Sequence, residues 1–470
     1  MDKNIQDLYA IFNDIVGDNN NFTLPADKEK YEKGYRYGKG LAFCVLRPKN
    51  SDQLCKILSI CNEYKIAVVP QGGNTGLVSA SVPDMSGGQV VISTELLNTD
   101  IFEIEGDKLK LGAGWVLDAV NEKLSPHGLF LPIDIGSSGS CNIGGMIATN
   151  AAGTRAGRYG NVKARLISYQ TALADGSLLD FECKPEQTKQ DNSRIDFANP
   201  FVGSGGWLGM ITKAVFALEK LPKVSDSVVL VPESDGSIKS ILDCLTEKFG
   251  KKLTAFEGMS NDALKLVAKN IPNCKPMFGK EDATYVLLAE VSGSDENEDV
   301  SEELLEAFGS LMEMGLVTNG LQGKPEQYWH MRHHISEALA KEGKVIATDV
   351  AVGNRADLAN FRQEMTSKLQ GVYPDIIIAP FGHEMLGAMH FNMVWPKDKT
   401  LSDEKKRDIQ SMVYDVIVNK FDGTFSAEHG IGPHNQWAYN KFTPDDIKQK
   451  SADLKAKYDP NGIMNPNIYY

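Results

Sequence analysis

The spacing of apolar residues predicts a mixture of helices and strands along the chain. Apolar side chains three and four residues apart in SDQLCKILSICNEYKI predict an amphipathic helix that begins at Ser51, and the apolar AVVP that follows predicts a strand. QGGNTGL, at residues 71–77, then predicts a glycine turn. Backbone amides in such a turn can bind a pyrophosphate, although an ordinary tight turn has the same composition.

From about Leu221 the pattern alternates between strand and helix. Strands are predicted in KLPKVSDSVVLVPES and ATYVLLAEVSG, and helices in SIKSILDCLTEKFG and VSEELLEAFGSLMEMG. This order predicts an α+β layer that begins after a domain boundary near Pro222. The final YDPNGIMNPNIYY is rich in turn residues and predicts a tail that packs onto another part of the protein. A chain of 470 residues exceeds the size of one core, so two or three structural units are expected.

Residues 132–160, PIDIGSSGSCNIGGMIATNAAGTRAGRYG, concentrate glycine and other small residues. Such a segment cannot build a core, and its backbone can approach a large, flat ligand that carries phosphate. A flexible linker is the alternative, but Ile143, Met146, Arg155 and Tyr159 interrupt the low complexity. NIGGMIATNAAG is also expected to open a helix whose N-terminal amides face an anion. No Walker A sequence is present, and GSGGWLG at residues 203–209 misses the third spacing of the dinucleotide pattern GxGxxG.

Charge and cysteine content exclude several classes of protein. A formal net charge of −13 argues against nucleic acid or an anionic membrane as a partner. The seven cysteines include no CxxC pair, so neither a zinc ribbon nor a disulfide framework is predicted. The acidic first residues lack the features of a signal or transit peptide, and no apolar run reaches the length of a membrane span. A cytoplasmic location is therefore expected.

Histidine is concentrated in the last third of the chain. His383 and His390, in FGHEMLGAMHFNMVW, are seven residues apart, which on one helix is about 10 Å of rise and too far for a shared metal ion. Gly382 and Gly387 instead predict a strand that turns and returns. Such a turn would bring the two rings together.

An acidic residue from TFSAEHGIG would complete a metal site. With Glu428 the two imidazoles would form a set with open positions, as catalytic metal sites do, and the adjacent His429 would serve as a base. Three unrelated histidines are the alternative.

Arg332 is the third candidate for chemistry. In YWHMRHHISEAL the spacing of Trp329, Ile335 and Leu339 is compatible with one helix that directs a basic group into a cleft. Arginine binds a carboxylate through two parallel hydrogen bonds, as an acidic substrate would require. A solvated, charged helix face is the commoner meaning of such a run.

These motifs together resemble the flavin-dependent D-2-hydroxyacid dehydrogenases of the vanillyl-alcohol-oxidase (PCMH) type, which include D-2-hydroxyglutarate and D-lactate dehydrogenases. VVPQGGNTGL, the 132–160 segment, GSGGWLGMIT, the paired histidines, FSAEHGIG and DPNGIMNP occur in the family's order and span nearly the whole chain. The resemblance implies an α+β fold with a PCMH-type, two-lobed FAD-binding domain at residues 1–222. It also implies a substrate or cap domain with an antiparallel sheet and the metal site at 223–425, and a segment at 426–470 that returns to the FAD domain.

The resemblance implies that FAD is held non-covalently, since the first glycine loop carries no histidine to which a flavin could be attached. By similarity, the residues expected to contact FAD are Pro70, Gly72, Gly73, Asn74, Thr75, Gly76, Leu77, Pro132, Asp134, Gly136, Ser137, Cys141, Gly144, Gly145, Thr149, Asn150, Gly153, Arg158, Tyr159, Gly209, Ile211 and Asn465.

For the chemistry, the resemblance implies a divalent metal ion, expected to be zinc, on His383, His390 and Glu428. Arg332 and Asn392 would meet the substrate carboxylate, with Ser336 nearby, and His429 would take the proton of the α-hydroxyl group, whose pKa a metal lowers. The α-hydrogen would leave as a hydride to FAD, so that a D-2-hydroxyacid becomes a 2-oxo acid. The expected electron acceptor is an electron-transfer flavoprotein, a quinone or a cytochrome, and a homodimer is the expected assembly.

Three departures from the family's pattern affect these expectations. The family usually has HLGDGNLH where this chain has HEMLGAMH, and GSEGTLG where it has GSGGWLG. A lysine of the hydroxyglutarate enzymes falls at Ala347, and Lys344 could replace it only if the backbone brings it to the same pocket. The missing contact favours a generic D-2-hydroxyacid over D-2-hydroxyglutarate specifically, and D-lactate and more hydrophobic acids are among the candidates. A flavin oxidase that uses oxygen, and a flavin-binding paralogue without turnover, are the alternatives.

Overall fold

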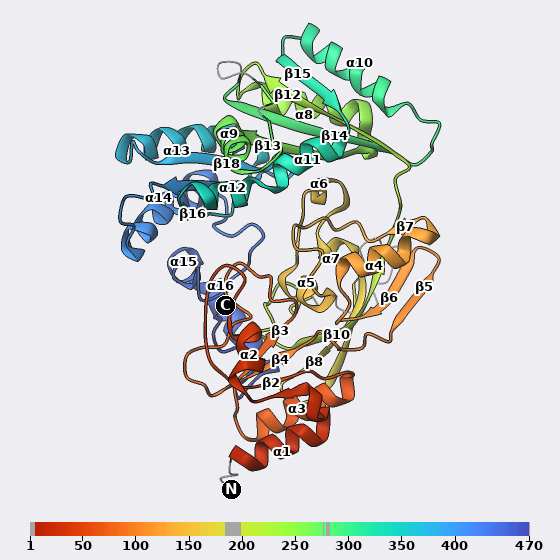
Figure 1. The fold of residues 1–470 in the computed structure, drawn as a ribbon, viewed down its shortest axis with the longest axis vertical. Coiled ribbons are helices and arrows are strands. Elements are labelled where there is room, and N and C mark those ends of the chain that lie inside the picture. Colours follow the sequence, from red (N-terminus) through yellow and green to blue (C-terminus); the bar gives the residue numbers. More distant parts are fainter. Residues whose placement is uncertain (1–4, 184–198, 276, 279–282, 470) are drawn as a thin grey trace. The chain divides into compact units, whose positions relative to one another are not determined.

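The computed structural model describes residues 5–183, 199–275, 277–278 and 283–469 (Figure 1). The chain divides into two compact units, the first made of residues 1–153, 160–220 and 428–470 and the second of residues 154–159 and 221–427. The breaks near residues 220 and 427 lie next to the boundaries expected at 222 and 425. The short segment 154–159, which the sequence places inside the glycine-rich stretch, belongs to the second unit.

The first unit begins with a small sheet whose spatial order is β1-β2-β4-β3, in which β2, β4 and β3 run parallel. Its elements are α1 (Ile5–Val16), β1 (Asn21–Phe22), α2 (Pro25–Glu32), β2 (Ala42–Leu46), α3 (Ser51–Glu63), β3 (Val68–Gln71) and β4 (Gln89–Ser93). The predicted helix from Ser51 and the strand after it are confirmed. Asn50 caps α3 by accepting from the Gln53 backbone N–H. Because β3 ends at Gln71, the glycine turn lies at the carboxyl edge of the parallel strands.

A five-stranded antiparallel sheet of order β5-β6-β10-β8-β9 follows in the same unit. The elements here are β5 (Phe102–Glu105), β6 (Lys108–Gly112), α4 (Leu117–Leu124), β7 (Leu129–Phe130), α5 (Ile143–Thr149), α7 (Val162–Arg165), β8 (Leu166–Ala172), β9 (Leu178–Glu182), β10 (Met210–Ala217), β11 (Glu219–Lys220), α15 (Gln436–Phe442) and α16 (Asp445–Tyr458). The predicted packing of the C-terminal tail is confirmed: Met464 bridges to Val68 of β3, and the Asn465 backbone N–H donates to the Val68 carbonyl at 2.7 Å.

The second unit is built on an antiparallel sheet of order β15-β12-β14-β13-β18-β19-β16, to which β17 adds by pairing with β19. Its elements are α6 (Ala156–Tyr159), β12 (Val224–Pro232), α8 (Ser237–Phe249), β13 (Leu253–Ser260), α9 (Asn261–Asn270), β14 (Tyr285–Gly293), α10 (Val300–Glu313), β15 (Val317–Gly323), α11 (Pro325–His333), α12 (Ile335–Glu342), β16 (Lys344–Ile346), β17 (Val350–Ala351), α13 (Leu358–Val372), β18 (Ile377–His383), β19 (Ala388–Trp395) and α14 (Asp403–Phe421). The alternation of strand and helix predicted from residue 221 is confirmed.

Helices cover both faces of this sheet (Figure 1). On one face α8 and α10 enclose a core with Leu230 and Leu287 of the strands. On the other, α9, α11 and α12 pack over Ala255, Met259 and Phe381. This second face carries the candidate chemistry, because the side chains of a strand alternate between faces and Glu257 and His383 share the alternation of Met259 and Phe381.

The single helix expected around Arg332 is wrong. The chain forms two helices, α11 and α12, which are separated at His334. Trp329, Ile335 and Leu339 are nevertheless all buried in one core, because both helices pack on it.

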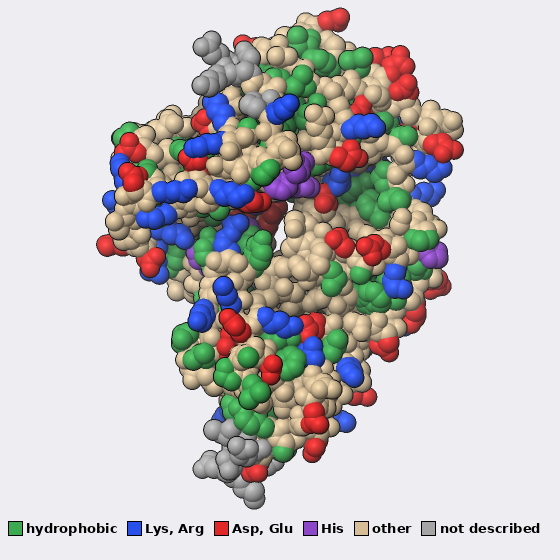
Figure 2. All heavy atoms as spheres, in the orientation of Figure 1, with side chains coloured by type: hydrophobic (Ala, Val, Ile, Leu, Met, Phe, Trp, Pro, Cys, Tyr) green, Lys and Arg blue, Asp and Glu red, His purple; other side chains and the backbone are tan. Residues whose placement is uncertain are grey.

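None of the helices in the described residues is long and apolar enough to cross a membrane. Acidic and basic side chains are interspersed over the face shown in Figure 2, so the formal net charge of −13 is not gathered there into one patch.

Candidate functional site

In the first unit the two glycine-rich loops meet. A Cβ on Gly73 would lie 1.9 Å from the Ser140 carbonyl oxygen, and one on Gly72 would lie 3.4 Å from the Gly145 Cα. At Gly73 only glycine permits this approach, whereas the distance at Gly72 is an ordinary van der Waals contact. Two motifs that lie far apart in the sequence therefore form one backbone surface.

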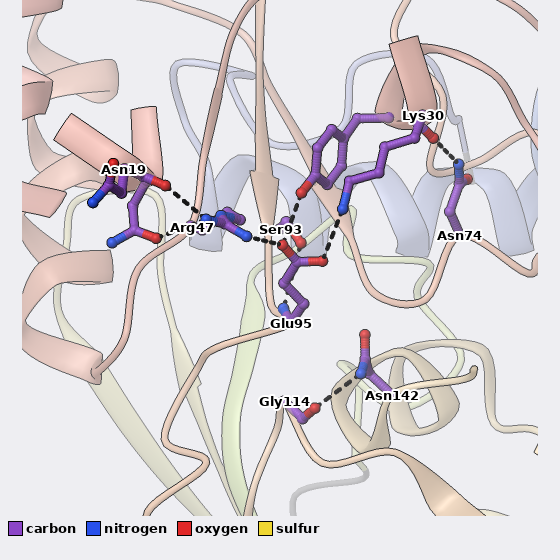
Figure 3. Close-up of polar contacts among 10 residues, drawn as sticks. Asn19, Lys30, Arg47, Asn74, Ser93, Glu95, Gly114 and Asn142 are labelled. Atoms are coloured by element: carbon purple, nitrogen blue, oxygen red, sulfur yellow. Dashed lines mark hydrogen bonds and ion pairs between the residues drawn. The ribbon is translucent and has the colours of Figure 1, made fainter. Parts of the chain in front are cut away.

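This surface has room beside it and a buried acceptor in it. No described atom lies within 4 Å of a Cβ built on Gly76 or on Gly136. Asn142 is buried and donates to the Gly114 carbonyl at 2.9 Å, which turns its oxygen to the opposite side (Figure 3). Within the described residues that oxygen has no hydrogen-bond partner. This surface of glycine backbone, which we call the cradle, contains one buried acceptor oxygen without a hydrogen bond. It fits a flat cofactor that presents N–H or O–H groups.

The helix expected in NIGGMIATNAAG is confirmed as α5, but its first two amides do not face an anion. The Ile143 N–H donates to the Trp115 carbonyl and the Gly144 N–H to the Ala113 carbonyl, both at 2.9 Å. These first amides of α5 are therefore committed to the neighbouring loop, which a sequence pattern does not reveal.

Several of the residues expected to contact FAD have structural hydrogen bonds. The Asn74 amide donates to the carbonyls of Lys33 and Lys30 (Figure 3), and Thr149 donates to the Gly145 carbonyl. Asn150 ends α5 in the left-handed conformation and accepts from the Lys163 N–H at 3.0 Å. The Asn465 amide donates to the Ala80 and Gly205 carbonyls at 2.9 and 2.8 Å. These side chains shape the loops.

The other expected contacts are distributed over both units. Gly144 packs on Ala113, Gly153 packs on the Asp134 carbonyl, and Cys141 is a buried thiol whose pKa burial raises to about 11. Those in the first unit are Pro70 in β3, Thr75 and Leu77 in the first loop, Pro132, Asp134, Ser137 and Cys141 before α5, and Gly209 and Ile211 at the start of β10. Arg158 and Tyr159 lie in α6 of the second unit, where the Arg158 Nε–H donates to the Lys251 carbonyl at 2.6 Å.

An ion cluster supports the edge of the parallel sheet beside these loops (Figure 3). Glu95 accepts from the Tyr31 hydroxyl at 2.7 Å and from Arg47 at 2.8 Å, and Lys30 lies 3.7 Å away. Burial opposes ionisation of Glu95, but the hydrogen bonds from Arg47 and Tyr31 and the charge of Lys30 outweigh it and lower the pKa of the carboxyl.

Trp207, one of the departures from the family's pattern, packs with the C-terminal segment. Its carbonyl accepts from Lys455 Nζ at 2.6 Å, and the ammonium lies 5.0 Å from its ring centroid. Lys455 also pairs with Asp459 at 2.7 Å. The bulky side chain is therefore accommodated by α16 and the residues after it.

In the second unit the strand pairing brings the two histidines together. The predicted strand that turns and returns is confirmed as β18, a 3₁₀ turn at Glu384–Leu386, and β19. His390 pairs with Phe381, so it lies diagonally from His383 on the same face. The ring centroids are 5.6 Å apart, and one ligand atom of each ring lies within 4.8 Å of the other. Asp349, which sequence reasoning missed, places a carboxylate oxygen within the same distance of His390.

Glu257 is the second residue that sequence reasoning missed. It is buried on β13, directly opposite His383 on β18, and its Oε1 lies 2.6 Å from His383 Nδ1. Its Oε2 accepts from Arg332 Nε at 2.8 Å and lies 2.7 Å from Arg332 Nη2. Only an isolated glutamate in the strand FEGMS marks it in the sequence, and no spacing connects it to His383.

The structure places the remaining candidates of this unit near the same face. Asn392 is buried on β19, and its Oδ1 accepts from the Thr348 N–H at 3.3 Å. Ser336 is half-buried near the start of α12, four residues after Arg332 and beyond the break at His334. Lys344 does not replace the lysine missing at Ala347: its Nζ is exposed at the edge strand β16 and donates to the Lys399 carbonyl at 2.8 Å.

Glu428 and His429 begin the last segment of the first unit, directly after Ala427. Ala427 is held in the second unit by a hydrogen bond from its N–H to the Asp349 carbonyl at 3.2 Å. Consecutive Cα atoms are about 3.8 Å apart, so the backbone of both residues starts within about 8 Å of that anchor.

Two known domain families match the chain. The FAD binding domain family matches residues 42–182, and the C-terminal domain family of FAD linked oxidases matches residues 226–468. A probable mitochondrial D-2-hydroxyglutarate dehydrogenase of Oryza sativa subsp. japonica is 34% identical, covering 91% of this chain and 75% of the relative. A putative mitochondrial D-lactate dehydrogenase of Schizosaccharomyces pombe is 30% identical over 98% and 89%.

Solved structures share the fold. Alkyldihydroxyacetonephosphate synthase matches with a TM-score of 0.74 at 15% identity, covering 98% of this chain and 85% of the other. p-Cresol methylhydroxylase matches with a TM-score of 0.74 at 13% identity over 98% and 96%. The expected α+β, PCMH-type fold is therefore confirmed.

The expected cytoplasmic location is wrong. The relatives above are named as mitochondrial enzymes, as is the D-2-hydroxyglutarate dehydrogenase of Danio rerio, which is 32% identical over 91% of this chain and 78% of its own length. The two domain matches and the relatives along nearly the whole chain show that this protein is a flavoenzyme that belongs to the family of FAD-linked oxidases.

Proposed function

We propose that this enzyme oxidises a D-2-hydroxyacid to the corresponding 2-oxo acid. The observation that carries the proposal is the group of Arg332, Glu257, His383 and His390 on one sheet face, in a chain whose relatives are named D-2-hydroxyglutarate and D-lactate dehydrogenases. When bound, FAD supplies the hydride acceptor, and a divalent metal ion, proposed to be zinc, supplies a Lewis acid for the α-hydroxyl group.

The first unit would hold FAD without a covalent bond. Bare backbone at Gly72, Gly73 and Gly76 allows a pyrophosphate to approach closely, and Gly136 leaves open space for the rest of the cofactor. The buried Asn142 oxygen would accept one of its N–H or O–H groups.

Four side chains would carry the chemistry around the metal. His383 and His390 fit a metal site because their ligand atoms lie within 4.8 Å of each other, and Glu428 follows the second unit by one peptide bond. This His, His, carboxylate set is typical of catalytic zinc. His429, one residue further, would take the proton of the substrate hydroxyl.

Arg332 would bind the substrate carboxylate. Glu257 occupies the guanidinium edge formed by Nε and Nη2, and the edge formed by Nη1 and the other Nη2 hydrogen has the geometry for a second carboxylate. Asn392, whose oxygen is committed to Thr348, would add an N–H donor, with Ser336 nearby.

The substrate tail is proposed to lack a second carboxylate. The position of the missing lysine is occupied by Ala347, and Lys344 is directed to Lys399. D-Lactate or a longer apolar D-2-hydroxyacid is therefore favoured over D-2-hydroxyglutarate.

The reduced flavin must pass its electrons on. We propose an electron-transfer flavoprotein, a quinone or a cytochrome as the acceptor. A relative from Saccharomyces cerevisiae, 28% identical over 95% of this chain, is named a D-2-hydroxyglutarate–pyruvate transhydrogenase, which adds 2-oxo acids as a further class.

The direct test is anaerobic reduction of the bound flavin. The purified yellow protein is mixed with the D- and L-forms of lactate, 2-hydroxybutyrate, 2-hydroxyglutarate and malate, and flavin absorbance is followed. We expect bleaching by D-lactate or D-2-hydroxybutyrate, weaker bleaching by D-2-hydroxyglutarate, and none by the L-forms.

Two results would contradict parts of the proposal. Faster bleaching by D-2-hydroxyglutarate than by D-lactate would overturn the tail assignment alone. A yellow protein that no D-2-hydroxyacid bleaches would overturn the reaction itself.

A further inference from the structure

Glu257 connects the two halves of the proposed site through one buried carboxylate. Its side chain is 1% exposed, and the side chains of His383 and Arg332 on either side of it are 6% and 7% exposed. The contact with His383 is a direct cross-strand pair between β13 and β18, and Arg332 approaches from α11 with its guanidinium carbon 4.5 Å from the Phe381 ring centroid. Each partner therefore has a fixed place on the sheet face.

The contact with Glu257 decides which His383 nitrogen carries the hydrogen. A carboxylate accepts and does not donate, so the 2.6 Å contact requires the hydrogen of His383 on Nδ1. Neutral imidazole then keeps its lone pair on Nε2. A carboxylate that holds a histidine in this tautomer is the usual support for a metal ligand.

The other oxygen of the same carboxylate orients Arg332. Oε2 accepts from Nε at 2.8 Å and forms an ion pair with Nη2 at 2.7 Å, and these two contacts with one oxygen orient the guanidinium. Each oxygen of Glu257 therefore has its own partner: Oε1 contacts the proposed metal ligand, and Oε2 contacts the arginine proposed to bind the substrate.

We infer that Glu257 is a positioning residue that sets the His383 tautomer for metal binding and aims Arg332 at the substrate carboxylate. The inference rests on the proposed function. Glu257 acts through its two partners and touches neither substrate nor metal.

Glu290 on β14 offers a matched control. It is 2% exposed and accepts from Arg155 Nε and Nη2 at 2.9 and 3.0 Å, from Trp329 Nε1 at 2.6 Å and from Thr254 Oγ1 at 2.8 Å. It is therefore a carboxylate of equal burial, in the same unit, with an arginine partner and no imidazole among these contacts.

The experiment compares Glu257→Gln and Glu290→Gln in FAD-loaded protein. Glutamine keeps the volume but must direct its NH₂ group at either the imidazole N–H or the guanidinium, so one contact is lost. Zinc affinity is measured by competition with a chelating dye. Glu257→Gln is expected to weaken zinc binding by about 10- to 100-fold, whereas Glu290→Gln leaves zinc affinity within about twofold of wild type. Thermal unfolding and flavin absorbance report whether each variant is folded and loaded.

Kinetics with the acid that bleaches the wild-type flavin give a second readout. At saturating zinc, Glu257→Gln is expected to raise KM more than it lowers kcat, because a misdirected Arg332 weakens carboxylate binding. Glu290→Gln should not produce this split.

The outcomes separate the inference from the proposed function. Wild-type protein that binds no zinc overturns the metal site and the inference with it. Wild-type protein that binds zinc, with Glu257→Gln binding it equally well, overturns the inference alone. Equal losses in both variants would likewise overturn it, because they would reflect general loosening of the unit.

Discussion

At the residue scale, the proposed chemistry divides between side chains fixed by buried hydrogen bonds and side chains carried by a loop. His383 and Arg332 are buried and share the Glu257 carboxylate. His429 is half-buried and follows the end of the second unit by two residues. A general base must reach its proton but need not be locked before the substrate binds. This difference matches the roles proposed for the three residues.

Replacing His429 with Asn is expected to slow flavin reduction by about 100- to 10,000-fold, since positioned proton transfer contributes roughly that factor. FAD and zinc contents should stay near those of the wild type. Stopped-flow absorbance under anaerobic conditions measures the rate, and elemental analysis measures the metal.

His434→Asn is the matched control, because His434 lies five residues further in the same unit and stacks on Tyr37 at 3.9 Å. It should reduce its flavin at close to the wild-type rate. A His429→Asn protein with an unchanged rate would show that another group takes the proton.

At the element scale, pairing between neighbouring segments creates the candidate groups within each unit. The antiparallel return of β18 into β19 places two histidines on one face, and β13 adds Glu257 beside them. In the first unit the loop after β3 meets the loop before α5 only because Gly73 lacks a side chain. The cradle is thus a property of two loops together.

Gly76→Ala tests the cradle without disturbing the fold. No described atom lies within 4 Å of the added Cβ, and Gly76 is not in the left-handed region, so the apoprotein should keep its stability. If FAD fills this space, the methyl group costs about 1–3 kcal/mol of binding, as overpacking does, or roughly 5- to 150-fold in affinity. Flavin fluorescence on titration of the apoprotein measures it.

Gly309→Ala, on the exposed face of α10, is the control and should leave FAD affinity unchanged. Wild-type affinity in Gly76→Ala would place the cofactor elsewhere.

At the scale of the whole molecule, the chain contains two units with separate cores. Val45, Val69 and Val91 belong to the core of the first, and the second has a core on each face of its sheet. Units with separate cores can unfold as separate cooperative transitions.

Differential scanning calorimetry is therefore expected to show two transitions. FAD at 100 times its dissociation constant should stabilise the first unit by about 2.7 kcal/mol, which raises its midpoint by roughly 5–10 °C. Zinc should shift mainly the other transition, since two of its three proposed ligands, His383 and His390, lie in the second unit and only Glu428 lies in the first. A single transition that both ligands raise equally would show that the two units unfold together.

Much of the secondary structure could be predicted from local sequence patterns. The helix from Ser51, the strand and glycine turn after it, the alternation from residue 221 and the turn between His383 and His390 all follow from the neighbouring residues, because apolar period and turn composition are local. The partners of the first two α5 amides could not be predicted, for the same reason. Its amides bond to residues 113–115, which no pattern in 142–150 reveals.

The sequence by itself determined the motifs, the α+β class and the turn that brings the two histidines together. Only the tertiary structure decided which side chains support them. Glu257 lies 126 residues from His383 and 75 from Arg332, and no short period links such positions. Strand register brings the carboxylate opposite the imidazole, and burial makes the hydrogen bonds obligatory, since an unpaired charge there would be costly. Lys344 shows the converse, because the register of β16 directs a suitable side chain to Lys399.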